Sequence, residues 1–348
     1  MNQVIVRLAQ RPLGEIVIGE HLVVDRDVPV REQLEDGEVL IRVMWLSVDP
    51  AMRGWMSSAK SYLPPSPLGE PMRANGVGRV TRSKSDKFDV GAVVSGFLGM
   101  QEYSILPEKK IRKVVVPDGV SPRLALGVLG NNGLTAYFGL FEVGHPKPGD
   151  TVVVSAAAGA TGSIAAQITK GVLGCRTIGI AGGEEKRLWL SNSLNLDDAI
   201  DYKNDDIGKA LKRTCPDGID VYFDNVGGVT LNEVLKRLNR GGRVVLCGAI
   251  SSYNTPGSPG PSNYVNLIST RSKMQGFIVL DYAKQYPKAL ADLTCWLQEG
   301  KIKYEEDIVD GIANTPEALL RLFKGQNLGK VVVQVAGDGD LQAFRSSL

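Results

Sequence analysis

The sequence predicts an α/β protein in which a doubly wound, parallel-sheet nucleotide-binding domain is inserted into a β-rich domain. Strands alternate with helices from Thr151 onward, β-rich irregular segments precede this region, and a lone strand follows it. The chain has 348 residues, more than one hydrophobic core usually serves, so we expect two domains. The expected parts are a β-rich domain (1–125), the nucleotide-binding domain (126–297) and a return to the β-rich domain (298–348).

Three segments predict the strands of the first part. They are "EVLIRVMWLSVD" (38–49), "GVGRVTR" (76–82) and "GAVVSGFLGMQEYSIL" (91–106). Each carries β-branched or aromatic residues between Gly, Pro and Asp, which is typical of short strands joined by turns. This pattern of short strand-like segments ends near Pro122.

The middle of the chain predicts six strands separated by helices. The strands are "TVVVS", "RTIGI", "DAIDY", "IDVYFDNV", "RVVLCGAI" and "KMQGFIVL". Helices are expected from Thr161, Glu184, Asp205 and Val229. Six strands with intervening helices match a doubly wound sheet covered on both faces.

The C-terminal part predicts one helix and one strand. In "NTPEALLRLFKGQ", Thr315 is expected as the helix cap, Pro316 at the first helical position and Gly325 at the end. The strand "KVVVQV" (330–335) has no partner of its own in the tail. We therefore expect it to pair with the N-terminal β domain, which makes the nucleotide-binding domain an insertion.

Composition excludes several classes of protein. The net charge is +2, and no basic stripe with interleaved aromatics is present, so neither nucleic acid nor an anionic membrane is an expected partner. No signal-peptide pattern or apolar run of roughly 18 residues occurs, which favours the cytoplasm. The four cysteines are far apart and the two histidines have no Cys or His neighbour, so we expect no metal site and buried or half-buried thiols.

The segment "VVVSAAAGATGSIAAQI" (152–168) resembles a dinucleotide-binding elbow. The three slots of the G-x-G-x-x-G fingerprint are Ala157, Gly159 and Gly162, with Ala in place of the first Gly. The segment follows an apolar strand, opens a helix and lies in a βαβ unit, as the motif requires. It predicts phosphate binding at the helix N-terminus, and a purely structural elbow is the alternative.

The end of the second strand favours NADP(H) over NAD(H). NAD-binding proteins place an acid here, about 20 residues on, whereas this chain has "IGIAGGEEKRLWL". Gly182 and its neighbouring glycine leave room for a 2′-phosphate, and Lys186 and Arg187 supply positive charge. Two alternatives stay open: "EEKR" is a solvated helical turn, or one of its glutamates reaches the ribose. Tyr202 either donates to the same phosphate or caps the third strand.

Seven segments spread over nearly the whole chain carry a family resemblance. They are "LSVDPAMRGWM" (46–56), "GVLGNNGLTAYFGL" (127–140), "AAAGATGS" (156–163), "FDNVGG" (223–228), "CGAISSYN" (247–254), "QGFIV" (275–279) and "GQNLGKVVV" (325–333). The chain resembles the zinc-free medium-chain dehydrogenase/reductase proteins. It is most similar to their alkenal/one double-bond reductase branch, which includes leukotriene B4 12-hydroxydehydrogenase/prostaglandin reductase, plant double-bond reductases and curcumin reductase.

This resemblance implies a GroES-like β-rich catalytic domain, NADP(H) as cofactor and a homodimer in which the "QGFIVL" strand continues the sheet. The resemblance places three groups of residues at the cofactor. At the pyrophosphate it places Ala158, Gly159, Ala160, Thr161, Gly162 and Asn225, and at the 2′-phosphate Gly182, Lys186 and Tyr202. At the nicotinamide half or its cleft it places Thr135, Gly248, Tyr253, Phe277, Ile278, Val279, Asn327 and Gly329.

The expected substrate residues include two departures from the family pattern. They are Ala51, Met52, Asn131 and Tyr253. Many relatives have Tyr where this chain has Ala51, and the usual Met-Pro of "GMPGxTAY" is replaced by Asn131 and Asn132. We expect both changes to alter the substrate cleft rather than the cofactor site.

The expected reaction is NADPH-dependent reduction of the C=C bond of α,β-unsaturated aldehydes or ketones. Hydride goes to the β-carbon, and a donor must stabilise the carbonyl oxygen where negative charge grows. Tyr253 follows the fifth strand, at the edge where ligands of open α/β sheets bind, and an ordinary phenol is protonated at neutral pH. The alternative is a packing tyrosine. Tyr282 is a second candidate that we expect to be structural, as we do Arg53 and Trp55.

Two other functions compete with the enone reductase. One is another zinc-free reaction, either quinone reduction or the oxidation of a secondary alcohol. The other is an NADPH-binding protein without turnover.

Overall fold

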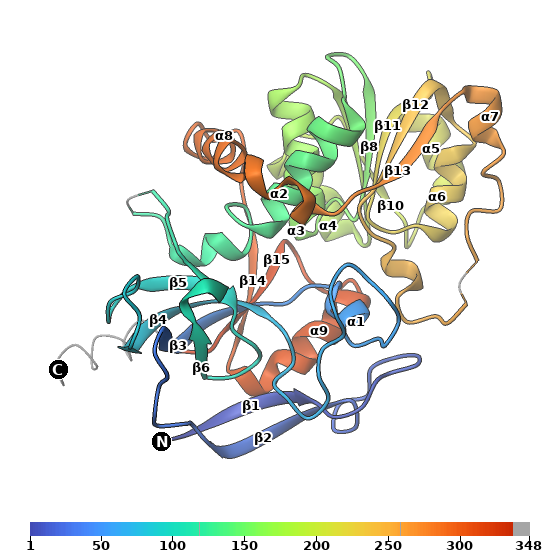
Figure 1. The fold of residues 1–348 in the computed structure, drawn as a ribbon. Coiled ribbons are helices and arrows are strands. Elements are labelled where there is room, and N and C mark those ends of the chain that lie inside the picture. Colours follow the sequence, from blue (N-terminus) through green and yellow to red (C-terminus); the bar gives the residue numbers. More distant parts are fainter. Residues whose placement is uncertain (118, 258, 337–348) are drawn as a thin grey trace. The chain divides into compact units, whose positions relative to one another are not determined.

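The chain forms two compact units, shown as a ribbon in Figure 1, where the computed structural model describes residues 1–117, 119–257 and 259–336. The first unit comprises Met1–Leu126, Glu306–Asn327 and the chain from Val331, and the second comprises Gly127–Glu305 and Leu328–Lys330. The second unit is thus an insertion in the sequence of the first. Residues 337–348 of the predicted return segment lie outside the described residues.

The first unit is built on antiparallel strands. One sheet has the order β14-β15-β3-β4-β5-β7, with β6 also pairing with β3, and β1 pairs with β2 separately. Its elements are β1 (Asn2–Leu8), β2 (Leu22–Pro29), β3 (Glu38–Ser47), α1 (Met52–Trp55), β4 (Asn75–Ser83), β5 (Val93–Phe97), β6 (Tyr103–Pro107), β7 (Ile111–Lys113), β14 (Glu306–Asp310), α9 (Thr315–Phe323) and β15 (Lys330–Gln334).

The last strand pairs with the N-terminal part of the chain, as the sequence predicts. In β15, Val332 lies opposite Ser47 of β3, and Gln334 lies opposite Trp45. Val331, Val332 and Val333 are almost completely buried, so hydrophobic burial on both faces holds the strand inside this sheet.

The start of α9 differs from the prediction. The helix begins at Thr315, one residue before the expected position, and Asn314 precedes it as the cap. The Thr315 hydroxyl donates to the carbonyl oxygen of Ile312 at 2.6 Å, so it is not a helix cap. Because Thr315 is completely buried, its hydroxyl takes the nearest backbone acceptor.

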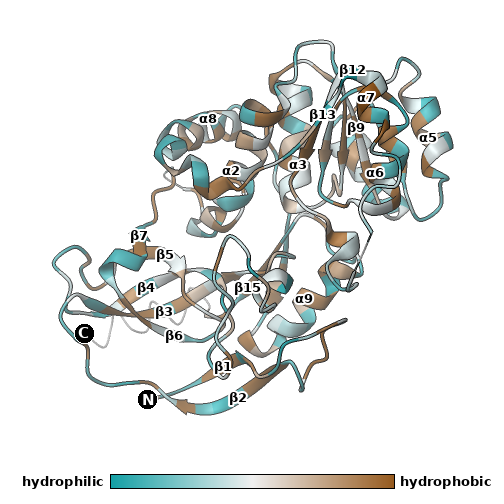
Figure 2. Ribbon diagram, turned by 45° about the vertical axis from the view of Figure 1, so that its right-hand side comes forward, coloured by the Kyte–Doolittle hydropathy of each residue, from teal (hydrophilic) through white to brown (hydrophobic). Residues whose placement is uncertain are grey.

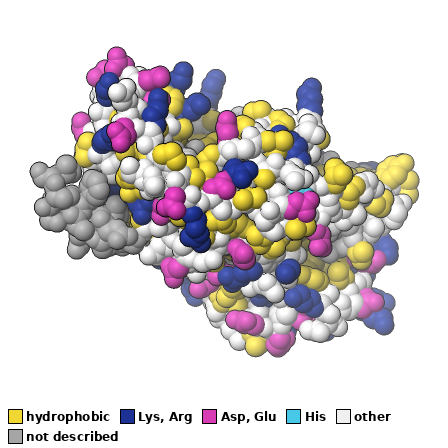
Figure 3. Space-filling view, turned by 90° about the horizontal axis from the view of Figure 1, so that it is seen from below, with side chains coloured by type: hydrophobic (Ala, Val, Ile, Leu, Met, Phe, Trp, Pro, Cys, Tyr) yellow, Lys and Arg dark blue, Asp and Glu magenta, His cyan; other side chains and the backbone are white. Residues whose placement is uncertain are grey.

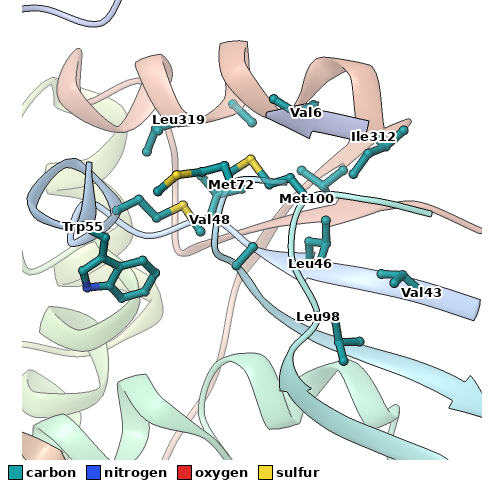
Figure 4. Close-up of a cluster of buried hydrophobic side chains, with 14 of the residues drawn as sticks. Val6, Val43, Leu46, Val48, Trp55, Met72, Leu98, Met100, Ile312 and Leu319 are labelled. Atoms are coloured by element: carbon teal, nitrogen blue, oxygen red, sulfur yellow. The ribbon is translucent and has the colours of Figure 1, made fainter. Parts of the chain in front are cut away.

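Methionines fill much of the core of the first unit. Met52, Met56, Met72 and Met100 have no exposed surface and belong to one hydrophobic cluster. Figure 4 shows Met72 and Met100 among aliphatic side chains from both the N-terminal and C-terminal segments. Unbranched, polarisable thioethers suit such an irregular junction between a sheet and a helix.

The second unit contains a six-stranded parallel sheet in the order β10-β9-β8-β11-β12-β13. This is the doubly wound order 3-2-1-4-5-6, so the predicted fold class is confirmed. Its elements are α2 (Asn131–Phe138), β8 (Thr151–Ser155), α3 (Ala160–Gln167), β9 (Arg176–Ala181), α4 (Glu184–Leu188), β10 (Asp198–Asp201), α5 (Ile207–Thr214), β11 (Ile219–Asp224), α6 (Gly228–Leu235), β12 (Leu238–Leu246), α7 (Asn266–Thr270), β13 (Lys273–Gly276) and α8 (Tyr286–Gln298).

Helices cover both faces of this sheet. In Figure 1, α2 and α3 lie on one face and α5 and α6 on the other. Figure 2 shows the strands as largely hydrophobic. Val152, Val153 and Val154 of the central strand β8 are completely buried, which is expected of a parallel strand enclosed by helices.

The sixth strand is shorter than predicted. It ends at Gly276, and a 3-10 helix (Val279–Gln285) follows. The Tyr286 hydroxyl donates to the Val279 carbonyl oxygen at 3.0 Å, a bond that helps to keep this segment out of the sheet.

The second unit extends beyond the expected boundary between residues 297 and 298. Past α8, Lys303 and Gln167 exchange two hydrogen bonds: the Lys303 N–H donates to Gln167 Oε1 at 2.7 Å, and Gln167 Nε2 donates to the Lys303 carbonyl oxygen at 2.9 Å. Because Gln167 ends α3, these bonds hold the following segment in the second unit.

On the face shown in Figure 3, acidic and basic side chains are interspersed. Within the described residues, no helix is long and apolar enough to cross a membrane.

Candidate functional site

The glycine elbow joins β8 to α3 at the carboxyl edge of the parallel sheet. Ala156 adopts a positive φ of 47°, and the Gly159 N–H donates to the Ala156 carbonyl oxygen at 2.9 Å. The first helical bond runs from the Ser163 N–H to the Gly159 carbonyl oxygen at 2.9 Å. The backbone N–H groups of the turn before Ser163 therefore have no acceptor within the helix, which is the arrangement that receives a phosphate.

The third slot of the fingerprint requires glycine for steric reasons. A Cβ atom at Gly162 would lie 2.2 Å from the Ala156 carbonyl oxygen, whereas one at Gly159 would lie 3.2 Å from the same atom. The first turn of α3 thus packs so closely against the turn after β8 that this position must be glycine, which is the role of the third glycine in the fingerprint.

Gly329 lies directly against the elbow. Its N–H donates to the Ala158 carbonyl oxygen at 2.8 Å, and it forms an isolated parallel bridge with Gly159. Its φ is +69°, and a Cβ atom there would lie 2.1 Å from the Glu305 carbonyl oxygen. A residue near the C-terminus is therefore built into the same site, and only glycine fits there.

The tip of β9 has the open surface that the sequence predicts. A Cβ atom at Gly182 would lie 2.7 Å from the ring of Tyr202, so the glycine allows the phenol to lie over the strand end. In α4, both carboxylate oxygens of Glu184 accept from Arg187, at 2.5 and 2.6 Å. Lys186 lies between these two paired residues in the sequence.

Sequence reasoning did not identify Asp201, the last residue of β10, as part of this tip. Its Oδ1 accepts from the Gly183 N–H at 2.7 Å and its Oδ2 from Asn204 at 2.7 Å. Burial opposes ionisation, but the hydrogen bonds from Gly183, Asn204 and Lys203 outweigh it and hold the pKa of Asp201 below its ordinary value. The carboxylate is thus bound by internal donors. The signal was visible in the sequence as an acid at the end of "DAID".

A second buried acid, Asp224, organises the end of β11. Its Oδ1 accepts from the Tyr222 hydroxyl, the Ser155 hydroxyl and the N–H groups of Val226 and Gly227, at 2.8 to 3.2 Å. Its Oδ2 is buried with no partner among the described residues. Burial raises the pKa of Asp224 despite these donors. By accepting from the N–H groups of Val226 and Gly227, the carboxylate holds the conformation of the "NVGG" turn (225–228).

This turn connects the predicted residue Asn225 to the elbow. Asn225 Nδ2 donates to the Ser155 carbonyl oxygen at 2.7 Å, and its N–H donates to the Ser155 hydroxyl at 2.9 Å. Ser155 ends β8, immediately before the elbow. Ser155 was not among the predicted site residues.

Tyr253 and Gly248 lie together just past β12. The Ala249 N–H donates to the Tyr253 phenolic oxygen at 3.1 Å. A Cβ atom at Gly248 would lie 3.1 Å from that oxygen and 3.3 Å from the Asn225 carbonyl oxygen. The absence of a side chain at Gly248 leaves space for the phenol at the carboxyl edge of the sheet.

Asn132, one of the departures from the family pattern, contacts a predicted cofactor residue: its Nδ2 donates to the Thr161 hydroxyl oxygen at 3.1 Å, in the first turn of α3. That the two asparagines alter the substrate cleft rather than the cofactor site stays a prediction. Asn131 is exposed, and its carbonyl oxygen accepts from the Thr135 hydroxyl at 2.7 Å. The two asparagines thus face different surroundings because adjacent positions of a helix point about 100° apart.

The segment after β13 packs on the helix that follows α2. The Phe277 ring lies where a Cβ atom at Gly139 would be 2.8 Å away. Tyr282 stacks on Phe138, with ring centroids 4.7 Å apart and an interplanar angle of 7°. This contact supports the structural role expected for Tyr282.

Three predicted residues, Ala51, Met52 and Asn327, belong to the first unit, and the others lie in the second. Met52 has no exposed surface, so it serves the core. Nearby, Arg53 donates to the carbonyl oxygens of Pro12 and Gly14, both at 2.9 Å, and is also structural.

The thiols differ in exposure. Cys175 and Cys215 are buried and Cys247 is half-buried, but Cys295 is exposed, contrary to expectation. Burial raises the pKa of Cys247 to about 12. Within residues 1–117, 119–257 and 259–336, no group of three or more His, Cys, Asp or Glu side chains could hold a metal ion.

The arrangement fits a phosphorylated dinucleotide. A helix N-terminus with a glycine cradle lies at the point where the strand order reverses. The neighbouring strand tip has glycines, a phenol and a lysine; nearby, Glu184 is paired with Arg187 and Asp201 accepts from internal donors.

Two family models match the chain: "N-terminal domain of oxidoreductase" over residues 5–114 and "Zinc-binding dehydrogenase" over residues 160–294. The chain is 46% identical to the putative NADP-dependent oxidoreductase YfmJ of Bacillus subtilis, over 95% of this chain and 97% of that protein. It is 41% identical to the NADP(+)-dependent 2-alkenal reductase of Nicotiana tabacum, over 89% of this chain and 92% of that protein.

A solved structure is similar over nearly the full length. It is CurA from Vibrio vulnificus in complex with NADPH, which has 42% sequence identity and a TM-score of 0.89, covering 96% of this chain and 99% of that one.

Proposed function

Because this chain belongs to the zinc-free medium-chain dehydrogenase/reductase family, in its alkenal reductase branch, we propose that it reduces the C=C bond of α,β-unsaturated aldehydes and ketones. It is an NADP-dependent oxidoreductase that acts on activated C=C bonds, and its cofactor is NADP(H). The aldehyde and ketone substrates and the residue roles below are the proposal.

The residues that would hold the cofactor form one edge of the sheet. The N–H groups at Ala160, Thr161 and Gly162 would bind the pyrophosphate. Lys186 and Tyr202 would bind the 2′-phosphate, with Gly182 leaving space for it. Asn225 and Gly248 continue this edge toward Tyr253.

The bound nicotinamide supplies the hydride that the β-carbon accepts. We assign the rest of the chemistry to Tyr253, whose phenol donates a hydrogen bond to the carbonyl oxygen as negative charge develops there. The bond from the Ala249 N–H to the phenolic oxygen carries this proposal. It fixes the oxygen at the carboxyl edge and, because the oxygen accepts this bond, polarises the O–H group toward donation.

The proposed role of Tyr253 is tested by Tyr253→Phe, with Tyr282→Phe as the matched control. Loss of one donor to a developing oxyanion lowers kcat by roughly 100-fold or more. We expect that loss with trans-2-alkenals for Tyr253→Phe, an almost unchanged Kd for NADPH, and nearly normal kcat for Tyr282→Phe. An unchanged kcat in Tyr253→Phe would exclude the role.

The substrate class is tested by following NADPH oxidation at 340 nm with trans-2-alkenals, quinones and no acceptor. Faster oxidation with alkenals supports the proposal. Faster oxidation with quinones favours quinone reduction, and tight NADPH binding without oxidation favours a non-enzymatic protein.

We also propose a homodimer formed through β13. This four-residue strand is the last in the sheet. Its Lys273 and Gln275 are exposed and its Met274 is half-buried. An open strand edge readily pairs with a second copy. Sedimentation equilibrium giving a monomer at micromolar concentration would contradict this.

A further inference from the structure

We propose that Asn132 is a positioning residue for the cofactor: by donating to Thr161 Oγ1, it directs the Thr161 hydroxyl hydrogen toward the pyrophosphate. This inference rests on the proposed cofactor site. The bond joins the first turn of α2 to the first turn of α3, from Asn132 Nδ2 to Thr161 Oγ1, at 3.1 Å.

Thr161 differs from those threonines of this unit whose hydroxyl bonds back along the chain, and it shares with Thr230 of α6 and Thr294 of α8 the lack of such a bond among the described residues. Thr135, Thr169 and Thr214 each donate their hydroxyl hydrogen to the carbonyl oxygen four residues earlier, at 2.7 to 3.1 Å. Thr161 stands in the first turn, so the residue four positions earlier, Ala157, precedes the helix. No hydrogen bond donated by the Thr161 hydroxyl is found among the described residues, and the residue is half-exposed.

The orientation of the Asn132 amide decides what the hydroxyl can do. With Nδ2 toward Thr161, the hydroxyl oxygen is an acceptor and its hydrogen remains for a ligand. With the amide reversed, the hydroxyl would donate to Oδ1 and be lost to a phosphate. An anion at the elbow therefore selects the first orientation, since only that one provides it with another donor.

The same orientation leaves a buried polar atom without a partner. Asn132 is only 8% exposed, and its Oδ1 has no hydrogen-bond partner in the described part of the chain. An unsatisfied buried oxygen lowers the stability of the fold. A residue kept only for packing would be better replaced by an apolar side chain of similar size, so cofactor binding and stability make opposite demands at this position.

The test is Asn132→Leu, with Kd measured by calorimetry for NADPH and for 2′-AMP, which lacks the pyrophosphate. A hydrogen bond to a charged group corresponds to roughly a tenfold change in affinity. We expect Kd for NADPH to rise about tenfold, Kd for 2′-AMP to stay unchanged, and the thermal midpoint of the cofactor-free protein not to fall. Asn132→Asp, an isosteric second variant whose carboxylate accepts the Thr161 hydrogen, should weaken NADPH binding at least as much.

Asn263→Leu is the matched control. Asn263 Nδ2 also donates to one acceptor, the Asn232 carbonyl oxygen at 2.7 Å, and its Oδ1 is also buried without a partner among the described residues. This variant should leave Kd for NADPH unchanged.

A Thr161→Val background separates positioning from a general structural effect. There, Asn132→Leu should produce no further loss of NADPH affinity, because the hydroxyl through which Asn132 acts is absent. The inference is overturned if NADPH affinity is unchanged in Asn132→Leu, if the loss persists in Thr161→Val, or if NADPH and 2′-AMP weaken equally. Wild-type protein that binds 2′-AMP and NADPH with equal affinity would instead count against the pyrophosphate site of the proposed function.

Discussion

The methyl group of Ala157 lies in the space that Gly179 leaves open: a Cβ atom at Gly179 would be 3.0 Å from the Ala157 Cβ. Ala157 occupies the first glycine slot of the fingerprint and is completely buried. The larger residue in the elbow after β8 is thus accommodated by a smaller one on the neighbouring strand β9. This relationship explains how the elbow keeps its form without the first glycine.

This pairing predicts non-additive stability changes. Gly179→Ala should lower the free energy of unfolding by about 2 kcal/mol, because the new methyl group also meets Leu190 at 2.9 Å. In an Ala157→Gly background the same substitution should be less destabilising. Urea titrations of the four proteins measure the coupling. Strict additivity would contradict the proposed packing, and Gly276→Ala, where a Cβ meets nothing within 4 Å, controls for the effect of alanine itself.

The glycine in the third slot should be intolerant of any side chain. Gly162→Ala places a Cβ atom 2.2 Å from a backbone oxygen that cannot move without opening the elbow. We expect a loss of about 3 kcal/mol in stability and at least a tenfold rise in Kd for NADPH. Gly171→Ala, whose nearest contact would be 3.6 Å from the Lys301 carbonyl oxygen, should bind NADPH normally. Normal binding in both variants would show that the elbow is not at the cofactor.

Lys186 should set the preference for the phosphorylated cofactor. Lys186→Ala is expected to raise KM for NADPH by roughly tenfold to a hundredfold and to leave KM for NADH nearly unchanged. Arg187→Ala is the control, since Arg187 is paired with Glu184 and should affect neither cofactor strongly. Equal use of NADPH and NADH by the wild-type enzyme would refute the 2′-phosphate assignment.

Asp201 should make the fold sensitive to acid. Because its pKa is lowered in the folded protein, its stabilising contribution is complete above its unfolded value of about 3.9 and is lost as pH falls through the folded value. Asp201→Asn should therefore reduce the thermal midpoint at pH 7, and the difference from wild type should shrink below about pH 4. The exposed Asp217→Asn variant serves as control. A difference that stays constant down to pH 3 would contradict this.

Local patterns in the sequence determined the second unit's architecture. The alternation of apolar strands with helices set the parallel sheet, and the spacing of Ala157, Gly159 and Gly162 located the elbow. These features need only neighbouring residues, because strand and helix periods and tight turns are set by local sterics. The unpaired apolar strand at the C-terminus was also sufficient to predict its pairing with the first part.

Only the tertiary structure decided which distant groups complete the site. Asn132 meets Thr161, Gly329 meets Ala158, and Asp201 accepts from Gly183. Each contact joins segments far apart in the chain or on different strands, and its geometry depends on how closely helices and strands pack, which no local pattern encodes. The sequence by itself therefore specified the glycine elbow, while packing selected the buried amide and acids that surround it and the neighbouring strand tip.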